Sequence, residues 1–141
     1  MVANVPATSR PAFFQPALSG EVAGHPSGLA SDRLGEIVTG VADINQCIHI
    51  ILTTPKGSDP HRPTFGSELH LYLDYPIDSA RPHLVREAVD ALALWEPRIQ
   101  VMRVPVTRES ESGLLVSIEW VFADSVEAEM FSTRVPMRKV L

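Results

Sequence analysis

The spacing of its prolines is the feature that most limits what this chain can fold into. The 141 residues include 12 prolines, and each proline fixes φ and removes a backbone N–H donor. Between residues 1 and 33 there are four prolines and three glycines at short intervals, which prevents long helices and regular strand ladders there. From residue 34 onward the prolines outside the loop 55–66 are farther apart, so whole helices and strands fit between them.

This pattern divides the chain into three segments, an arm, a domain and a tail, with the bounds 1–33, 34–124 and 125–141. The arm contains one adjacent aromatic pair, Phe13 and Phe14, in polar surroundings. It is either a disordered tail or an arm that becomes ordered against a partner, with the two phenylalanines as anchors. Both interpretations stay open at this stage.

Apolar spacing predicts about three helices in the domain. The first runs from residue 41 to 54, where four apolar residues at helical spacing form one stripe: Ile44, Ile48, Ile51 and Leu52. Pro55 ends it, and a proline-rich loop follows to residue 66. A short second helix is expected over 67–76, with Ser67 as its N-cap.

The third helix has the strongest pattern and is expected to follow Ser79 as its N-cap, with Pro82 in its first turn. Its apolar residues recur every three or four positions: Leu84, Val85, Ala88, Val89, Leu92 and Trp95. Pro97 stops it, because the residue before a proline is pushed out of helical geometry.

Strands are expected on both sides of the helices. Residues 35–39 could form a short strand, and residues 114–122 alternate apolar and polar side chains as a half-buried strand does. Residues 98–106 alternate less cleanly and contain Pro105, so this strand is bulged or lies at an edge. The polar turn 107–113 joins the two as a hairpin, and the tail after residue 124 is a strand or a short helix. The fold class is therefore α+β, with about three helices packed on a small antiparallel sheet that has a C-terminal β-hairpin.

Composition excludes several functions. The net charge of −5 argues against nucleic-acid binding through phosphate contacts. Cys47 is the single cysteine, so neither an intrachain disulfide nor a multi-cysteine zinc site can form. No apolar run approaches the ~20 residues of a membrane helix, and the N-terminus lacks the pattern of a secretory signal, so assembly in the cytosol is expected. No metal, cofactor or catalytic motif is found, and none of these groups is expected.

Glu96, Pro97 and Arg98 stand where the third helix meets the following strand. They could be a salt-bridged helix stop, a catalytic acid with its partner, or a docking signature. As an exposed pair, Glu96 and Arg98 would contribute only ~0–1 kcal/mol. Arg98 offers five donors in a fixed fork, which suits a partner's carboxylate or carbonyls. As a glycosidase acid, Glu96 has the neighbouring Trp95 in its favour, but the cation at Arg98 and the lack of a clear second carboxylate argue against it.

Three short motifs in this order resemble the phage baseplate wedge protein W family over about residues 35–123. They are ILTTPKG at the end of the first helix, HRPTFGSEL in the loop and WEPRI at the junction, which matches the family's Glu-Pro-Arg core. The family includes a T-even phage baseplate wedge member once labelled a lysozyme and the E subunit of the type VI secretion baseplate. The chain departs from the family at Ser58 and Asp59, where the family usually has an acid and an arginine after the glycine. The contact that this acid and arginine make in the family is therefore not carried over.

The resemblance implies a non-enzymatic subunit of the inner baseplate wedge of a contractile tail, located in the virion tail baseplate and assembled in the host cytoplasm. It implies six copies per baseplate and, as partners, other wedge subunits, the tail sheath protein and the central hub or tube proteins. The subunit would act as a template for the first sheath ring. Glu96, Pro97 and Arg98 would be its docking motif. The alternative is a tail-associated peptidoglycan-degrading enzyme. The loop motifs favour a phage or tail-like particle over a secretion system.

Overall fold

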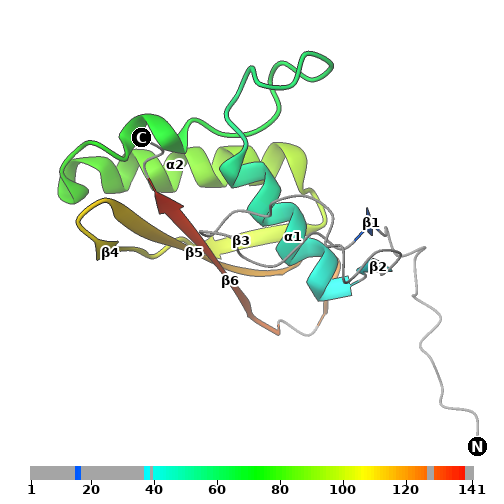
Figure 1. The fold of residues 1–141 in the computed structure, drawn as a ribbon. Coiled ribbons are helices and arrows are strands. Elements are labelled where there is room, and N and C mark those ends of the chain that lie inside the picture. The colour runs from blue at the N-terminus through cyan, green and yellow to red at the C-terminus, as the bar shows by residue number, and fades with distance from the viewer. Residues whose placement is uncertain (1–14, 17–36, 39, 127–128, 139–141) are drawn as a thin grey trace, which may run out of the picture.

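A computed structural model describes residues 15–16, 37–38, 40–126 and 129–138 of the chain. Most of the proline-rich arm, with Phe13 and Phe14, lies outside the described residues. The described part is a mixed fold of helices and antiparallel sheet, as the sequence predicts (Figure 1). None of its helices is long and apolar enough to cross a membrane.

Helix α1, Gly40–Thr53, is the first predicted helix. Its stripe of isoleucines and Leu52 is buried, which confirms the prediction from spacing. The hydroxyls of Thr53 and Thr54 donate back to the carbonyls of His49 and Ile50, at 2.7 and 2.6 Å. These bonds close the last turn before the chain turns away at Pro55.

The second predicted helix is wrong in extent. It is reduced to one 3-10 turn, η1, Leu69–Tyr72, so the fold has two α-helices rather than about three. The Ser67 hydroxyl does not cap it and donates instead to the carbonyl of Leu52 at 2.7 Å. The physical reason is that Ser67 fastens the base of the preceding loop, so it is not available to start a helix.

Helix α2, Ile77–Trp95, begins three residues earlier than predicted, with Pro76 rather than Ser79 as its N-cap. Pro82 therefore lies inside the helix and not in its first turn. Leu84, Ala88 and Leu92 are fully buried as expected, but Val89 is 37% exposed. The face toward the core is completed by small residues, Ala80 and Ala91, whose size gave no apolar signal comparable to valine.

The main sheet is built around β5, Gly113–Phe122. Two strands follow one edge of β5, β3 (Ile99–Arg103) and β4 (Val106–Ser110), and β6 (Phe131–Arg138) follows the other. Trp120 shows that the edges are opposite, because it pairs with Val101 in β3 and with Phe131 in β6. A separate pair of short antiparallel strands is formed by β1, Gln15–Pro16, and β2, Ile37–Val38.

The hairpin prediction is confirmed with changes. The strand expected over 98–106 is split into β3 and β4 around Pro105, with a register shift between Val101 and Arg103. This agrees with the bulge inferred from the sequence. The tail contributes β6, which pairs with β5 from Gly113 to Trp120, so the hairpin is not the C-terminal element. The sheet edge left by β5 explains why this segment becomes a strand.

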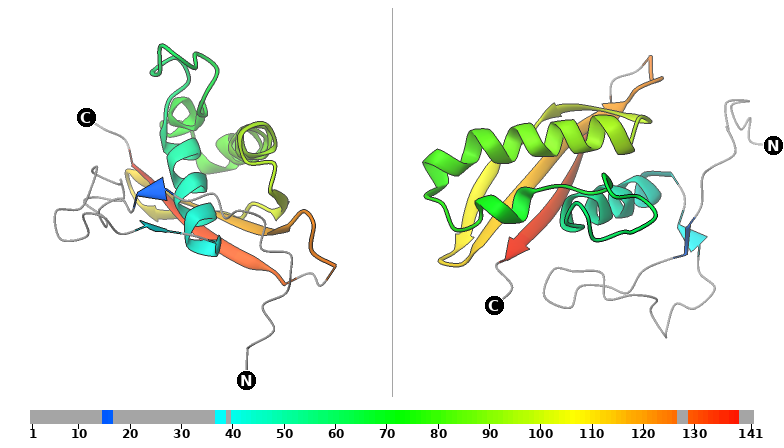
Figure 2. Two further views of the ribbon diagram at one scale, coloured as in Figure 1. Left: turned by 90° about the vertical axis from the view of Figure 1, so that its right-hand side faces the viewer. Right: turned by 90° about the horizontal axis from the view of Figure 1, so that it is seen from above.

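Both helices pack on one face of the sheet (Figure 2). Helix α1 contacts β6, and α2 contacts β3 and β4. Trp120 is fully buried beneath them and stacks on Phe131, with ring centroids 4.9 Å apart. Its indole N–H donates to the Thr133 hydroxyl at 2.9 Å, and that hydroxyl donates to the Asn45 side chain of α1 at 2.6 Å. This chain of hydrogen bonds satisfies the buried indole and ties α1 to the sheet.

Candidate docking site

Glu96, Pro97 and Arg98 form a tight junction between α2 and β3. Glu96 leaves helical geometry, with φ −130° and ψ 69°, yet its N–H still donates to the Leu92 carbonyl at 2.9 Å. The Arg98 carbonyl accepts from the N–H of Ala123 at 2.9 Å, just after β5. Pro97 is exposed between them. The junction is therefore fixed to the helix on one side and to the sheet on the other.

The Arg98 side chain is held by two carboxylates. Its Nε and Nη2 donate to the two oxygens of Glu96 at 2.6 and 2.7 Å, and its Nη1 donates to Asp43 of α1 at 2.7 Å. Such bidentate, charge-assisted bonds are among the strongest in proteins. The ion pair of Glu96 and Arg98 considered from the sequence is confirmed. Its extension to Asp43 joins the junction to a helix that lies 55 residues earlier in the chain.

Glu96, Asp43 and Arg98 form a cluster whose two carboxylates are buried, so its ion pairs contribute to the stability of the fold. Glu96 and Asp43 are 3% and 2% exposed, whereas the Arg98 side chain is 28% exposed. Hydrogen bonds to Glu96, followed by those to Asp43, raise the pKa of Arg98 against the opposing effect of burial. A buried carboxylate without a cation would be costly, so the three groups depend on one another.

Cys47 lies one turn after Asp43 on α1 and receives a hydrogen bond from Arg98 Nη2 at 3.6 Å. Burial, aided by the charges of Asp43 and Glu96, raises the pKa of the Cys47 thiol to about 11. The thiol is therefore protonated at neutral pH and is a poor nucleophile. This agrees with the interpretation of Cys47 as a structural residue.

The loop between α1 and η1 is closed at its base by Ser67. The Ser67 N–H donates to the Thr54 carbonyl at 2.9 Å, and the Ser67 carbonyl accepts from Lys56 at 3.2 Å. Gly66 has φ +103°, and a Cβ there would lie 2.1 Å from the Thr54 carbonyl oxygen. Only glycine fits this crossing. Within the loop, Asp59 accepts from the Arg62 Nε at 3.0 Å, which helps to hold its tip.

Two loop side chains reach the junction. The ring of Phe65 meets Trp95 edge-on, with centroids 5.1 Å apart, and the Arg62 guanidinium lies 4.1 Å from the centroid of Phe65. Between the loop, α1 and the end of α2 there is a pocket of about 270 Å³. It is lined by Cys47, Ile50, Ile51, Arg62, Phe65, Trp95 and Glu96. This volume is below the ~300–1,000 Å³ of typical small-molecule sites and suits one or two side chains of a protein.

Sequence reasoning identified the trio but missed Asp43, Arg62 and Phe65. One signal was available for Asp43, because an acid in the first turn of an apolar helix is suited to an N-terminal position. Nothing local indicated that it meets Arg98. Phe13 and Phe14, the predicted anchors of the arm, lie outside the described residues, and their role stays a prediction.

Glu96 and Asp43 do not have the arrangement of a glycosidase pair. The Arg98 guanidinium lies between the carboxylates of Glu96 and Asp43, in the space where the scissile bond of a glycoside would have to lie. In the described part of the chain, no group of three or more histidine, cysteine, aspartate or glutamate side chains could hold a metal ion. What the arrangement offers is a rigid, partly apolar surface beside a small pocket.

Comparison with known proteins agrees with this geometry. Residues 38–125 match the family model described as baseplate wedge protein gp25. The chain is 33% identical over 85 residues to baseplate protein W of Escherichia phage P2, which covers 60% of this chain and 74% of that protein.

Solved structures give the same fold. A Geobacter sulfurreducens protein, provisionally described as a tail lysozyme, is 30% identical with a TM-score of 0.62, covering 70% of this chain and 90% of its own. A chain of the postcontracted pyocin R2 baseplate is 29% identical with a TM-score of 0.54, covering 75% and 98%. A chain of the type VI secretion baseplate complex is 17% identical and shares the fold, with a TM-score of 0.61 over 70% and 93%.

The family model spans more than half of the chain, and it includes the loop, the pocket and the Glu-Pro-Arg junction. The chain therefore belongs to the gp25 family of baseplate wedge proteins, which are structural proteins of contractile tail-like systems.

Proposed function

We propose that this protein is a subunit of the inner baseplate wedge and that it docks other wedge proteins through the surface around Pro97. This surface consists of the junction 96–98, the loop 55–66 and the pocket between them. The observation that supports it is the fixed position of Arg98 between Glu96 and Asp43 beside that pocket. A surface that is already rigid loses little conformational entropy when a partner binds.

The internal ion pairs refine the role of the trio. The Arg98 fork is already bound to Glu96 and Asp43, so the trio presents a shape rather than two free charges. Pro97 is the exposed member, and the pocket beside it can accept an apolar side chain of a wedge partner. In this proposal Glu96 and Arg98 act by positioning Pro97 and the pocket wall.

The test uses exposed residues, because substitution of Arg98 would disturb the fold. We expect Arg62→Glu combined with Pro97→Asp to remove wedge proteins from a pull-down made in cells that produce the whole tail. Arg86→Glu is the matched control, since Arg86 is also an exposed arginine with a carboxylate partner, Asp90 at 3.7 Å. Melting temperatures of all variants should stay close to wild type. Equal recovery of wedge proteins by both variants would contradict the docking surface.

A second part of the proposal is that the open edge of β6 templates the first sheath ring. Within the described residues β6 pairs only with β5, and its eight residues form a longer uninterrupted edge than β3 or β4. An exposed strand edge can accept a strand from another chain, and natural proteins usually protect such edges. Pro136 lacks an N–H, so an added strand would pair most fully beside residues 131–135.

Hydrogen exchange tests the strand addition. We expect amides of residues 131–135 to gain protection when purified sheath protein is added, while amides of β4, on the opposite edge, do not change. Protection that is unchanged in β6 would refute the template role and leave the wedge docking intact. The expected six copies, the contacts with hub or tube proteins and assembly in the host cytoplasm are further parts of the proposal, which counting by mass spectrometry of purified particles can check.

The alternative, a peptidoglycan-degrading enzyme, is favoured only by the description of the Geobacter sulfurreducens protein. The guanidinium between Glu96 and Asp43 argues against it. A zymogram of the purified protein decides: we expect no clearing of peptidoglycan. A cleared band that disappears in Glu96→Gln would establish the enzyme instead.

A further inference from the structure

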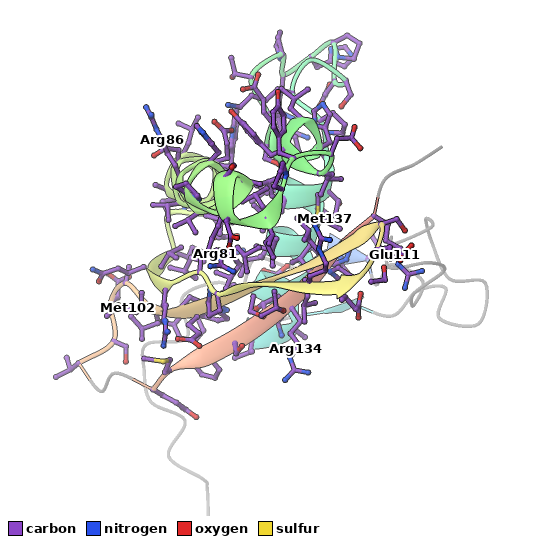
Figure 3. The ribbon with its side chains drawn as sticks, turned by 90° about the vertical axis from the view of Figure 1, so that its left-hand side faces the viewer. Arg81, Arg86, Met102, Glu111, Arg134 and Met137 are labelled. Carbon is purple, nitrogen blue, oxygen red and sulfur yellow. The ribbon has the colours of Figure 1, made fainter. Side chains whose placement is uncertain are left out.

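The sheet has a second face, and neither helix of the described residues covers it. In Figure 3, Met137 points from β6 toward the helices and Arg134 points away from them. We call the side with Arg134 the outer face. Among its members are Arg103 in β3, Leu115, Ser117 and Glu119 in β5, and Arg134, Pro136 and Arg138 in β6.

Strand register places three arginines on this face. Arg134 pairs with Ser117, Arg138 pairs with Gly113, and Arg103 pairs with Glu119. Paired residues of antiparallel strands share a face, and every second residue of β5 shares the face of Ser117. The three arginines therefore lie on the outer face, although they come from strands on both edges of β5.

These arginines have no carboxylate partner among the described residues. Arg103, Arg134 and Arg138 are exposed, and none has a described Asp or Glu oxygen within 4.0 Å, not even Arg103 with the opposite Glu119. Elsewhere in the described chain, each lysine and arginine from Lys56 to Arg98 has such a partner. Arg108, whose register places it on the other face, also lacks a described ion pair. What sets the outer face apart is that three such arginines share it, in a chain whose net charge is −5.

The same face has an apolar centre. Leu115 and Pro136 are directly paired and half-buried although no helix covers them. Pro136 stands between Arg134 and Arg138 along β6, with each arginine two residues away, which is about 7 Å in a strand. An apolar centre, Leu115 with Pro136, therefore lies between the guanidinium groups of Arg134 and Arg138. Protein interfaces have this composition, with an apolar centre and a polar or charged rim.

We propose that the outer face binds an acidic segment of another baseplate subunit, with an apolar side chain on Leu115 and Pro136 and carboxylates on Arg134, Arg138 and Arg103. This inference rests on the proposed function, and it adds a second interface opposite the helices. Guanidinium forks match carboxylates in a bidentate geometry. The Leu115–Pro136 centre and the neighbouring Glu119 favour a mixed protein segment over nucleic acid, which would present continuous phosphate.

A zero-length cross-link tests this contact in assembled particles. A carbodiimide joins a lysine amine to a carboxylate that touches it and does not react with arginine in this way. We therefore substitute Arg134→Lys and Arg138→Lys, which keep the charge, treat purified particles with carbodiimide, and identify linked peptides by mass spectrometry. We expect links from these lysines to Asp or Glu of a different subunit. Arg108→Lys is the matched control, because Arg108 is an exposed strand arginine without a described ion pair that pairs with Leu114, on the other face.

The outcomes separate the two proposals. Absence of the wild-type chain from particles would overturn the wedge role and this contact together. Presence of the chain without links from residues 134 and 138, or with equal links from residue 108, would overturn the acidic segment alone. Links between these lysines and a foreign carboxylate would establish it.

Charge variants give a quantitative check. We expect Arg134→Glu with Arg138→Glu to lower incorporation into particles about tenfold, and Glu119→Gln to raise or preserve it, because a like charge beside the acidic segment is removed. Arg108→Glu should stay within about twofold of wild type. Unchanged incorporation of the double variant, or tight binding of the wild type to a double-stranded DNA probe that the double variant loses, would overturn the proposal.

Discussion

The region from Lys56 to Arg98, which we call the helical side, and the strands from Arg103 onward differ in whether their cationic side chains form ion pairs. From Lys56 to Arg98, every lysine and arginine side chain in the described chain has a carboxylate within 4.0 Å. From Arg103 to Arg138, none of the described arginines has one. Charges from Lys56 to Arg98 help to hold the loop and the junction in shape, including the proposed docking surface, whereas the strand arginines form no ion pair within the described chain. The difference teaches that the ion pairs within the described chain end at Arg98. The arginines of the strands remain available to other subunits.

Arg98→Met should produce the largest loss of stability. It leaves the carboxylates of Glu96 and Asp43 buried without a cation, which costs about 3–5 kcal/mol in the free energy of unfolding. Urea unfolding measures this. Arg86→Met is the control, because Arg86 forms only an exposed pair worth ~0–1 kcal/mol.

A triple variant sharpens this prediction. Arg98→Met combined with Glu96→Gln and Asp43→Asn removes the buried charges together, so it should recover part of the lost stability. If Arg98→Met and Arg86→Met were equally mild, the helical side would not depend on its ion pairs, and the comparison would fail.

Gly66→Ala should have the next largest effect. The added Cβ meets the Thr54 carbonyl oxygen at 2.1 Å in a backbone with φ +103°, so we expect a loss of about 3 kcal/mol from combined strain and overpacking. Gly57→Ala is a matched control, since Gly57 has φ +86° but nothing within 4 Å of a Cβ. It should lose only about 1–2 kcal/mol. Thermal unfolding followed by circular dichroism compares the two, and equal losses would show that the contact with Thr54 relaxes at no cost.

Local pattern predicted the elements that carry a long, regular signal. The isoleucine stripe predicted α1, and the alternation of residues 114–122 predicted β5, because each periodicity reflects one buried face. The irregular alternation around Pro105 correctly indicated a bulge. The junction at Glu96 and Arg98 was found from the sequence because Pro97 must end the helix there.

The remaining features depend on contacts between distant residues. Ser67 has the right chemistry for an N-cap, but its hydroxyl donates a hydrogen bond to the carbonyl of Leu52, 15 residues earlier. Asp43 meets Arg98 across 55 residues, a pairing that no local period encodes. The tail became β6 because β5 offered an edge. Val89 continues the apolar spacing of α2 but is 37% exposed, and Ala80 and Ala91 complete the face toward the core instead.

Thr133→Val tests the buried polar chain between the two layers. Valine keeps the shape but leaves the Trp120 indole N–H without its acceptor and Asn45 without its donor. We expect a loss of about 1–2 kcal/mol in the free energy of unfolding. Thr107→Val is the control, because Thr107 is an exposed strand threonine, and it should change stability by less than about 0.5 kcal/mol. A neutral Thr133→Val would mean that the indole is satisfied in another way.

Arg134→Ala with Arg138→Ala should have the smallest effect on the isolated protein and a large one in the particle. Neither arginine has an ion pair within the described chain, so we expect the free energy of unfolding to change by less than about 0.5 kcal/mol. Incorporation into particles should fall nonetheless, because the cost appears only where a partner's carboxylates lose their cations. For Arg98→Met the main effect is expected on the stability of the isolated protein, rather than on incorporation into particles alone. If the double variant were as unstable as Arg98→Met, its arginines would serve the fold, and the division between the two sides of the molecule would be wrong.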